Sequence, residues 1–170
     1  IFSTEVFRCY TTYDVIGVEI GGAVKNVIAI AAGALSAREM GPNATAGMIT
    51  RGLSEITRLA VKMGANPLTL SGLAGMGDLV LTCTGGLSRN RTLGYNLGSG
   101  KKLAEILAET NTVAEGVKTS QSVYDLSHKI GVEMPIAEEV YNVIHKDKST
   151  HQAVRDILQR QLRREIEGMY

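Results

Sequence analysis

A lysine lies in the middle of the most apolar stretch of this 170-residue chain. Lys25 is preceded by Gly-Gly-Ala-Val and followed by Asn-Val-Ile-Ala-Ile. Lysine is rarely buried without a partner, and an amine partly removed from water can exchange protons with a substrate near neutral pH. The alternative is a lysine whose stem is buried while its ammonium reaches water or a structural ion-pair partner. Asn26, the next residue, can donate and accept hydrogen bonds.

An aspartate follows two glycines in the segment Gly-Met-Gly-Asp-Leu-Val-Leu-Thr, which ends at Thr82. The glycines let the backbone turn and bring the carboxylate of Asp78 close to a ligand. Near Lys25, this carboxylate would favour the charged ammonium and fix its direction, and it could also bind a hydroxyl group of a small polyol. The alternative is that Asp78 is the N-cap of a helix beginning at Leu79.

A serine and two arginines follow the next glycine pair, in the segment Ser88-Arg89-Asn90-Arg91. A serine N-cap with free backbone N–H groups behind it makes an anion site, and arginine adds donors that match phosphate oxygens. The alternative is an ordinary helix start with solvated arginines. Two other glycine patterns, Gly17 to Gly22 and Gly75-Met-Gly77, lack the residues that a phosphate loop or a dinucleotide-binding turn requires.

The composition is that of an ordinary soluble globular domain. The chain is 44% hydrophobic and 21% charged, with a formal net charge of +1, which gives no general reason to expect nucleic acid or an anionic membrane as partner. The longest apolar run, Val27 to Leu35, is too short to cross a bilayer, so no stable membrane insertion is expected. Cys9 and Cys83 lie far apart and no histidine stands at ligand spacing. We therefore expect no metal site, no disulfide and reduced thiols in the cytoplasm.

Hydrophobic periodicity predicts an all-α domain with one short strand before it. Residues 6–10 are rich in β-branched and aromatic types and predict a strand whose partners lie outside this chain. A helix that is apolar almost all round follows from Asp14 and predicts a central, buried element. Residues 74–86 carry many glycines and threonines, and only the alternative role of Asp78 places a helix there, beginning at Leu79. Further helices are expected at Asn43 to Met63 (N-cap Asn43, stop Gly64), Leu68 to Leu73, Arg89 to Leu97, Lys102 to Ala108, Gly116 to Ile130, Pro135 to Ile144 and His151 to Ile166.

These segments together resemble one family, the bacterial-type NAD(P)-dependent glycerol-3-phosphate dehydrogenases. The stretch from Asp14 to Ile30 is similar to the helix that carries the family's catalytic lysine. Gly-Met-Gly-Asp-Leu-Val-Leu-Thr-Cys-Thr and Leu-Ser-Arg-Asn-Arg resemble its next two substrate-site motifs, and Thr-Val-Ala-Glu-Gly-Val, from Thr112, resembles a later segment that faces the cofactor. Order and spacing agree, and the resemblance covers essentially the whole chain.

The resemblance implies a fold in two parts. Residues 1–13 would be the residual end of a dinucleotide-binding Rossmann domain, from which one N-terminal strand remains. Residues 14–170 would be the helical substrate-binding and catalytic domain, a multi-helix C-terminal domain of the 6-phosphogluconate dehydrogenase-like type. Since the rest of the Rossmann domain would be missing, the chain alone is expected to be inactive.

The same resemblance implies an activity and a set of site residues. The activity is the interconversion of sn-glycerol 3-phosphate and dihydroxyacetone phosphate with NAD or NADP, supplying glycerol 3-phosphate for glycerophospholipid synthesis. A cytoplasmic homodimer with no nucleic-acid partner is expected. Lys25 would donate and accept the proton. The substrate-binding residues would be Lys25, Asn26, Asp78, Thr82, Ser88, Arg89 and Asn90, and the cofactor-binding residues Arg89, Val113 and Glu115.

Two other interpretations are compatible with the residues alone. One is a non-catalytic helical module for oligomerisation or ligand binding, because no dinucleotide-binding fingerprint is present. The other is a related dehydrogenase that acts on a different small hydroxy compound, against which the Ser-Arg-Asn segment argues because it suits a phosphate.

Overall fold

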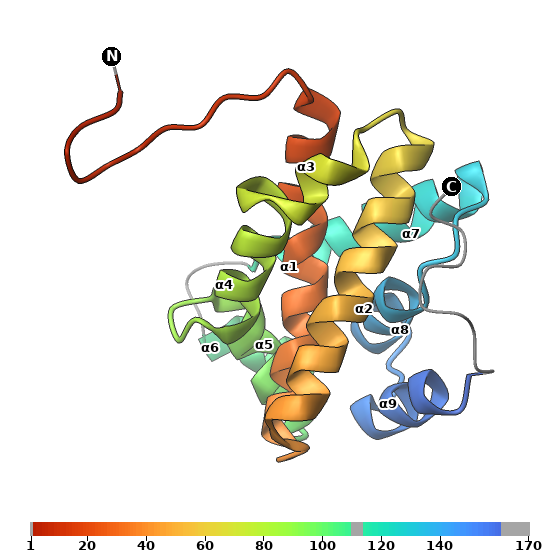
Figure 1. Ribbon diagram of the computed structural model, residues 1–170. Coiled ribbons are helices and arrows are strands. Elements are labelled where there is room, and N and C mark those ends of the chain that lie inside the picture. Colours follow the sequence, from red (N-terminus) through yellow and green to blue (C-terminus); the bar gives the residue numbers. More distant parts are fainter. Residues whose placement is uncertain (1, 110–113, 161–170) are drawn as a thin grey trace.

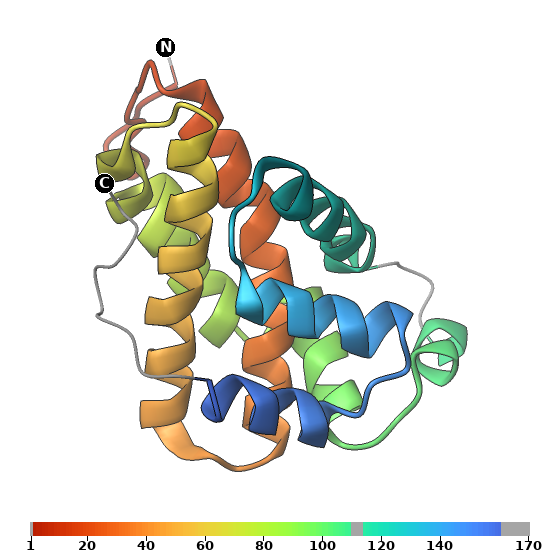
Figure 2. The same cartoon turned by 90° about the vertical axis from the view of Figure 1, so that its right-hand side faces the viewer.

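One long helix, α1 (Val15–Ala37), is the axis around which the other helices pack (Figure 1). The computed structural model describes residues 2–109 and 114–160. Helices α2, α4 and α5 run beside α1, and α7 and α8 pack on another of its sides, where α9 adjoins α8 (Figure 2). The elements after α1 are α2 (Gly41–Lys62), α3 (Pro67–Ser71), the π-helical turn η1 (Leu73–Gly77), α4 (Asp78–Thr84), α5 (Arg89–Gly98), α6 (Leu103–Glu109), α7 (Glu115–Ile130), α8 (Pro135–His145) and α9 (Thr150–Leu158).

The C-terminal half of α1 is the core of the domain. Val27 and Ile28 are fully buried, as an almost uniformly apolar helix requires. Glycines bring α5 against α1 backbone to backbone, because a side chain at Gly33 or Gly94 would overlap a carbonyl of the facing helix. The two helices run in the same direction in this contact. The polar start of α5 is therefore held beside the middle of α1, where Lys25 and Asn26 lie.

Most of the predicted helices are confirmed, with shifted ends. Ser88 caps α5 as predicted, and its Oγ accepts the N–H of Arg91 at 3.3 Å. The prediction of Asn43 as an N-cap is wrong, because α2 already begins at Gly41, with a proline in its first turn. The last helix ends at Leu158, and residues 161–166 of the predicted helix lie outside the described residues.

The glycine- and threonine-rich residues 74–86 are more helical than the sequence indicates, since only a helix from Leu79 was considered there. They form most of η1 and all of α4. Packing explains the difference: Gly75 lies so close to the backbone of Leu70 that no side chain would fit, and Leu79 and Cys83 of α4 are fully buried. Tertiary contacts thus override the low helix propensity of glycine and threonine.

The predicted strand at residues 6–10 is not confirmed. Within residues 2–109 and 114–160 the structure contains no strand. Residues 2–13 extend away from the helices (Figure 1), and Val6 and Tyr10 are 97% and 73% exposed. A strand needs hydrogen bonds to a neighbouring strand, and these residues have none in the described part of the chain. The fold described is all-α.

Helix α1 has the length and composition that a membrane-spanning helix needs, with a mean hydropathy of 1.7 over its most apolar window. The prediction from sequence considered only the uninterrupted apolar run from Val27 to Leu35. It therefore missed the longer apolar stretch of α1, which Glu19 and Lys25 interrupt. However, 56% of the window is buried among the other helices, and the core helix of a globular domain has the same features. The helix is therefore weak evidence for a membrane.

Candidate functional site

The ammonium of Lys25 meets the carboxylate of Asp78 between α1 and α4. Lys25 Nζ donates a hydrogen bond to Asp78 Oδ2 at 2.5 Å, across 53 positions of sequence. The side chains are 22% and 33% exposed, so the pair is partly removed from water but remains accessible from one side. Thr82, one turn later on α4, donates its hydroxyl to the Asp78 carbonyl at 2.6 Å and lies 3.5 Å from Oδ1. The arrangement fixes the direction of an ammonium that can donate to a bound oxygen.

The position of Asp78 excludes its alternative role as a helix cap. It is the first residue of α4, its side chain makes no capping bond, and the residue before it is Gly77. Close packing of η1 brings α4 to this place, because Gly21 of α1 leaves room for the carbonyl of Ala74, 2.9 Å from where a Cβ atom would lie. Such π-helical turns are frequent at functional sites, where the extra residue re-aims a side chain.

A second polar group lies beside the first, where α1, α5 and α7 meet. Asn26 and Asn90 are buried, at 8% and 7% exposed. Asn90 Nδ2 donates to Asn26 Oδ1 at 3.0 Å, and Asn90 Oδ1 accepts the N–H of Gly116 at 2.8 Å. Asn26 Nδ2 also lies 3.5 Å from Glu115 Oε2. Buried amides satisfied in this way hold the starts of α5 and α7 against α1.

Arg89 and Glu115 form the exposed edge of this second group. Arg89 Nη2 is 3.7 Å from Glu115 Oε1, and the side chains are 58% and 68% exposed. Ser88 caps α5 through the N–H of Arg91, and no hydrogen bond of the described residues uses the N–H groups of Arg89 and Asn90. Free N–H groups in the first turn of a helix and a guanidinium together suit an anion such as a phosphate.

The structure thus gathers the expected site residues on four neighbouring helices. Lys25 and Asn26, adjacent on α1, join the Asp78 group to the Asn90 group. Val113 lies outside the described residues. Sequence reasoning missed Gly116, whose N–H holds Asn90 and whose place has no room for a side chain. Its only signal was a glycine directly after the glutamate of the Val-Ala-Glu-Gly-Val segment.

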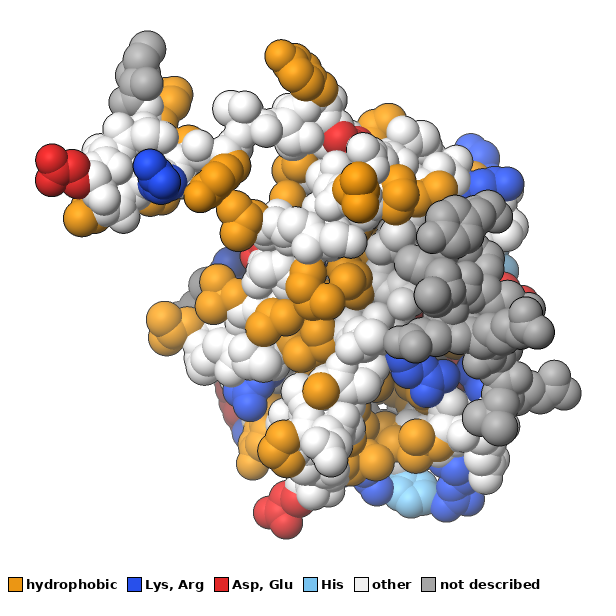
Figure 3. Space-filling view, viewed as in Figure 1, with side chains coloured by type: hydrophobic (Ala, Val, Ile, Leu, Met, Phe, Trp, Pro, Cys, Tyr) orange, Lys and Arg blue, Asp and Glu red, His pale blue; other side chains and the backbone are white. Residues whose placement is uncertain are grey.

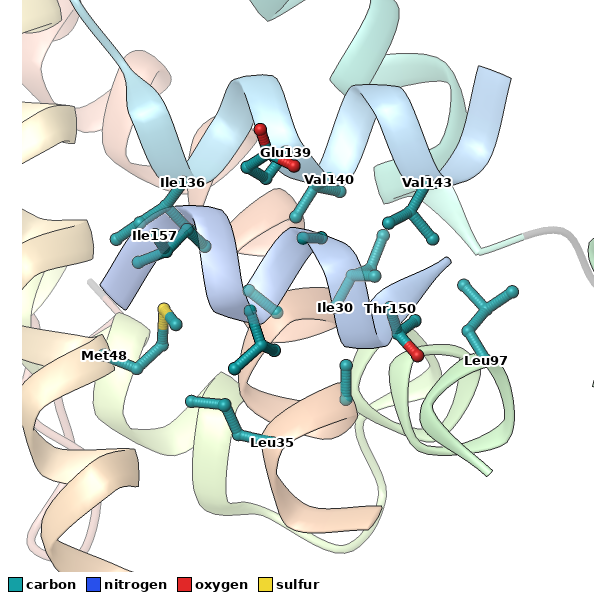
Figure 4. Close-up of a pocket in the computed structure, with 14 residues that line it drawn as sticks. Ile30, Leu35, Met48, Leu97, Ile136, Glu139, Val140, Val143, Thr150 and Ile157 are labelled. Carbon is teal, nitrogen blue, oxygen red and sulfur yellow. The ribbon is translucent and has the colours of Figure 1, made fainter. Parts of the chain in front are cut away.

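An apolar pocket elsewhere in the domain is not part of this site. It has a volume of about 30 Å³ and lies among α1, α2, α5, α8 and α9 (Figure 4). Its walls are almost entirely aliphatic, including Ile30, Met48 and Ile157. A pocket lined in this way offers too few polar partners for a charged metabolite or an ordered water molecule. Among the described residues no group of three or more His, Cys, Asp or Glu side chains could hold a metal ion.

Comparison with known proteins gives a consistent result. A family profile described as "NAD-dependent glycerol-3-phosphate dehydrogenase C-terminus" matches residues 14–155. The chain is 61% identical over 166 residues to a glycerol-3-phosphate dehydrogenase [NAD(P)+] of Myxococcus xanthus, covering 98% of this chain and 50% of that protein. A relative of the same name from Geobacter sulfurreducens is 59% identical, with 97% of this chain and 49% of that protein covered.

Solved structures agree with the sequence comparisons. A crystal structure of glycerol-3-phosphate dehydrogenase from Coxiella burnetii matches with a TM-score of 0.90 and 43% identity, covering 93% of this chain and 49% of that one. The enzyme from Saccharomyces cerevisiae matches with a TM-score of 0.84 and 28% identity, covering 94% and 46%. The chain spans about half the length of the curated relatives it matches. By sequence and by fold, it belongs to the NAD-dependent glycerol-3-phosphate dehydrogenase family and matches the C-terminal part of that family's proteins.

Proposed function

We propose that this chain is the substrate-binding and catalytic domain of an enzyme that interconverts sn-glycerol 3-phosphate and dihydroxyacetone phosphate with NAD or NADP. The observation that carries the proposal is the contact between Lys25 and Asp78, which fixes an ammonium in a partly dry, open position. The names of the relatives support the substrate and the cofactor. Residues 14–170 form this domain, and residues 1–13 belong to the end of a dinucleotide-binding domain. The product serves glycerophospholipid synthesis.

Lys25 performs the proton transfer in this proposal. When dihydroxyacetone phosphate is reduced, the ammonium polarises the carbonyl and gives its proton to the oxygen, and in the reverse direction the neutral amine takes the proton back. When bound, the nicotinamide cofactor supplies or accepts the hydride. Asp78 directs the ammonium of Lys25, and Thr82, 3.5 Å from Asp78 Oδ1, lies within reach of the hydroxyl groups of a bound glycerol 3-phosphate.

The phosphate end of the substrate lies at the start of α5. Arg89 supplies a forked donor, and the N–H groups behind the Ser88 cap supply further donors. Asn26 and Asn90 line the region between this anchor and Lys25, and within residues 2–109 and 114–160 the side-chain amide of Asn90 donates only one of its two N–H groups, to Asn26. Anchoring the remote phosphate positions the reacting carbonyl, which lowers the entropic cost of the reaction.

The cofactor-facing residues of this chain are Arg89, Glu115 and Val113. The chemistry of the described pair fits a dinucleotide, because an exposed carboxylate accepts hydrogen bonds from ribose hydroxyls and an exposed guanidinium binds phosphate oxygens. Most of the contacts to the cofactor would come from the half of the relatives that this chain does not match.

The test uses a joined protein, in which this chain replaces the matching half of the Myxococcus xanthus relative. The variant Lys25→Met should lower kcat for NADH oxidation by dihydroxyacetone phosphate about 1,000-fold, the scale of general acid catalysis. Competitive inhibition by inorganic phosphate should change less than about threefold, since the phosphate anchor is separate. Lys129→Met, at an exposed lysine of α7, is the matched control. Turnover within tenfold of the parent in Lys25→Met contradicts the proposal.

We also propose that the complete protein is a cytoplasmic homodimer. Large apolar side chains gather on the face formed by α3, η1 and α4 (Figure 3), and Leu68, Leu73 and Leu81 of these elements are 75%, 67% and 68% exposed. Patches of this kind often mark interfaces. Sedimentation equilibrium of the joined protein should give twice the mass of one chain, and a monomer at micromolar concentration contradicts the dimer.

A further inference from the structure

The carboxylate of Asp14 joins the start of α1 to a loop far along the chain. Its Oδ1 accepts the N–H of Gly17 at 2.9 Å and so caps α1. Its Oδ2 accepts the N–H of Asn66 at 2.9 Å, across 52 positions, from the loop between α2 and α3. The hydroxyl of Thr69 on α3, with the N–H groups of Gly17 and Asn66, lowers the pKa of Asp14 below its usual range. One side chain therefore has two separable roles, a helix cap and an anchor to α3.

The surroundings of Asp14 are built closely around this carboxylate. A Cβ atom at Gly17 would overlap the Asp14 carboxylate and lie 3.0 Å from Thr69 Cγ2, so a larger residue there would displace the carboxylate from its present position. Asn66 is itself fixed, because its side chain caps α3 by accepting the N–H of Leu68 at 3.0 Å. The anchor thus connects two capped helix starts.

Asp14 is also where the preceding segment is attached to the helical domain. In the described part of the chain, the hydrogen bonds of residues 2–12 are made among themselves and with Asp14, whose N–H donates to Thr12 Oγ1 at 3.1 Å. Their side chains are exposed, and Figure 1 shows the segment leaving the body at the end of α1 that lies beside α3. The matched part of the family begins at the same residue. The direction of the preceding chain is therefore set at this junction.

The consequence for the reaction rests on the proposed function. Positions 14 and 25 are eleven residues apart on one helix, about 16 Å along its axis at 1.5 Å per residue. A tilt of about 10° at the junction would displace the reacting groups by about 3 Å over that distance, and a misplacement of about 1 Å can cost about 100-fold in rate. The junction must therefore hold its direction within a few degrees.

We propose that Asp14 is a positioning residue. Through its bonds to Asn66 and Thr69, it fixes the direction in which the chain before α1 leaves the helical domain, and with it the placement of the dinucleotide-binding half relative to Lys25. Asp14 lies at the N-terminal end of α1, eleven residues before Lys25, and touches neither the substrate nor the cofactor.

The key variant is Asp14→Ser, which separates the two roles. Serine is a good N-cap and keeps the bond to Gly17, but it is too short to reach Asn66 and Thr69 as well. Thr69→Val removes one anchor bond and leaves Asp14 in place. Asp125→Ser, at an exposed aspartate of α7 that is bonded to Gln121, changes the charge equally and is the matched control.

The first measurement is structural and independent of turnover. Spin labels are placed on Cys9, which is exposed, and on Arg51→Cys at an exposed position of α2, in a joined protein whose other accessible thiols are replaced by serine. Cys83 stays unlabelled, because it is fully buried and burial raises its pKa to about 12. The distance distribution from pulsed electron paramagnetic resonance should become at least twice as wide, or shift by several ångströms, in Asp14→Ser. Thr69→Val should give a smaller change and Asp125→Ser none.

The second measurement connects the junction to the reaction. In Asp14→Ser, kcat should fall at least tenfold, while the inhibition constant of inorganic phosphate and the unfolding midpoint in urea stay close to those of the parent. An unchanged distance distribution in Asp14→Ser and Thr69→Val overturns the proposal. A widened distribution with unchanged kcat overturns the link to the reaction. Neither result depends on whether Lys25 transfers the proton, so failure of this inference is distinguishable from failure of the proposed function.

Discussion

Two carboxyl groups of this domain, those of Asp78 and Glu55, each lie beside the first residues of a helix, and their surroundings differ. Asp78 stands at the start of α4, is 33% exposed and pairs with the ammonium of Lys25. Glu55 of α2 is 2% exposed and accepts the N–H groups of Ile136 and Ala137, at 2.8 and 3.2 Å, at the start of α8. Under the proposed function the solvent-accessible carboxylate of Asp78 serves the substrate site, whereas the buried carboxyl group of Glu55 joins α2 to α8.

Their environments differ in what balances the charge. Burial raises the pKa of Glu55 to about 7, because desolvation outweighs the two backbone hydrogen bonds and the weaker attraction of Arg58 and Arg160. No cation bonds directly to Glu55 among the described residues. Asp78, in contrast, has a cation in direct contact. Removing either carboxylate should therefore damage a different property of the protein.

The largest expected effect on stability comes from Glu55→Ala. The variant leaves the N–H groups of Ile136 and Ala137 buried without an acceptor and opens a cavity, so the free energy of unfolding at pH 5.5 should fall by about 2–4 kcal/mol. Urea unfolding of the chain measures the change. The exposed Glu19→Ala on α1 should cost less than about 0.5 kcal/mol. A loss below 1 kcal/mol in Glu55→Ala would show that water or another group replaces the carboxylate.

Glu55 should also make stability fall as the pH rises. Below its ordinary pKa of 4.5 the carboxyl group is protonated in both states, and above about 7 folding must bury a charge. The free energy of unfolding should therefore decrease between pH 4.5 and about 7, by up to about 3 kcal/mol at about 1.4 kcal/mol per pKa unit. Urea midpoints across this range test the slope. Glu55→Gln should remove most of it, and an equal slope in both proteins would assign it to other groups.

Asp78→Asn should have the opposite effect to Glu55→Ala, because it should lower activity and leave the free energy of unfolding nearly unchanged. In the joined protein kcat should fall about 100-fold, because the amide no longer stabilises and directs the Lys25 ammonium. The free energy of unfolding should change by less than about 1 kcal/mol, as is usual for a partly exposed ion pair. Steady-state kinetics and urea unfolding of one preparation measure both. A loss of stability as large as that of Glu55→Ala would make Asp78 a structural residue too.

Sequence reasoning found one of these carboxylates and missed the other, for a physical reason. Lys25 was identified because a charged residue interrupts an apolar helix. Asp78 was identified because the preceding glycines let the backbone bring its carboxylate close to a ligand. Glu55 gave no such signal, because glutamate on an amphipathic helix is usually on the solvent side. Glu55 is buried where α8 packs on α2, and its bonding partner Ile136 is 81 residues further along the chain.

The fold shows the same division between local and distant causes. Helix starts and stops followed local chemistry, as at Ser88, which caps α5, and Gly131, whose φ of 69° ends α7. Residues 74–86 did not follow their local composition, because close packing on Leu70 and α1 makes η1 and α4 helical. The amide contacts of Asn90 with Asn26 and Gly116 likewise depend on three helices meeting. No spacing within one segment predicts such contacts.

The smallest effect on stability is expected at the exposed pair of Arg89 and Glu115. The charged groups are 3.7 Å apart and more than half exposed, so their coupling in a double-mutant cycle of Arg89→Met and Glu115→Gln should be below about 0.5 kcal/mol and should weaken with added salt. Binding should behave differently, because Arg89→Met removes a phosphate ligand and should raise the inhibition constant of inorganic phosphate at least tenfold. Glu115→Gln should leave that constant within about twofold. A coupling above 1 kcal/mol would mean that the ion pair holds α5 to α7. Arg89 and Glu115 would then have a structural role, as Glu55 has.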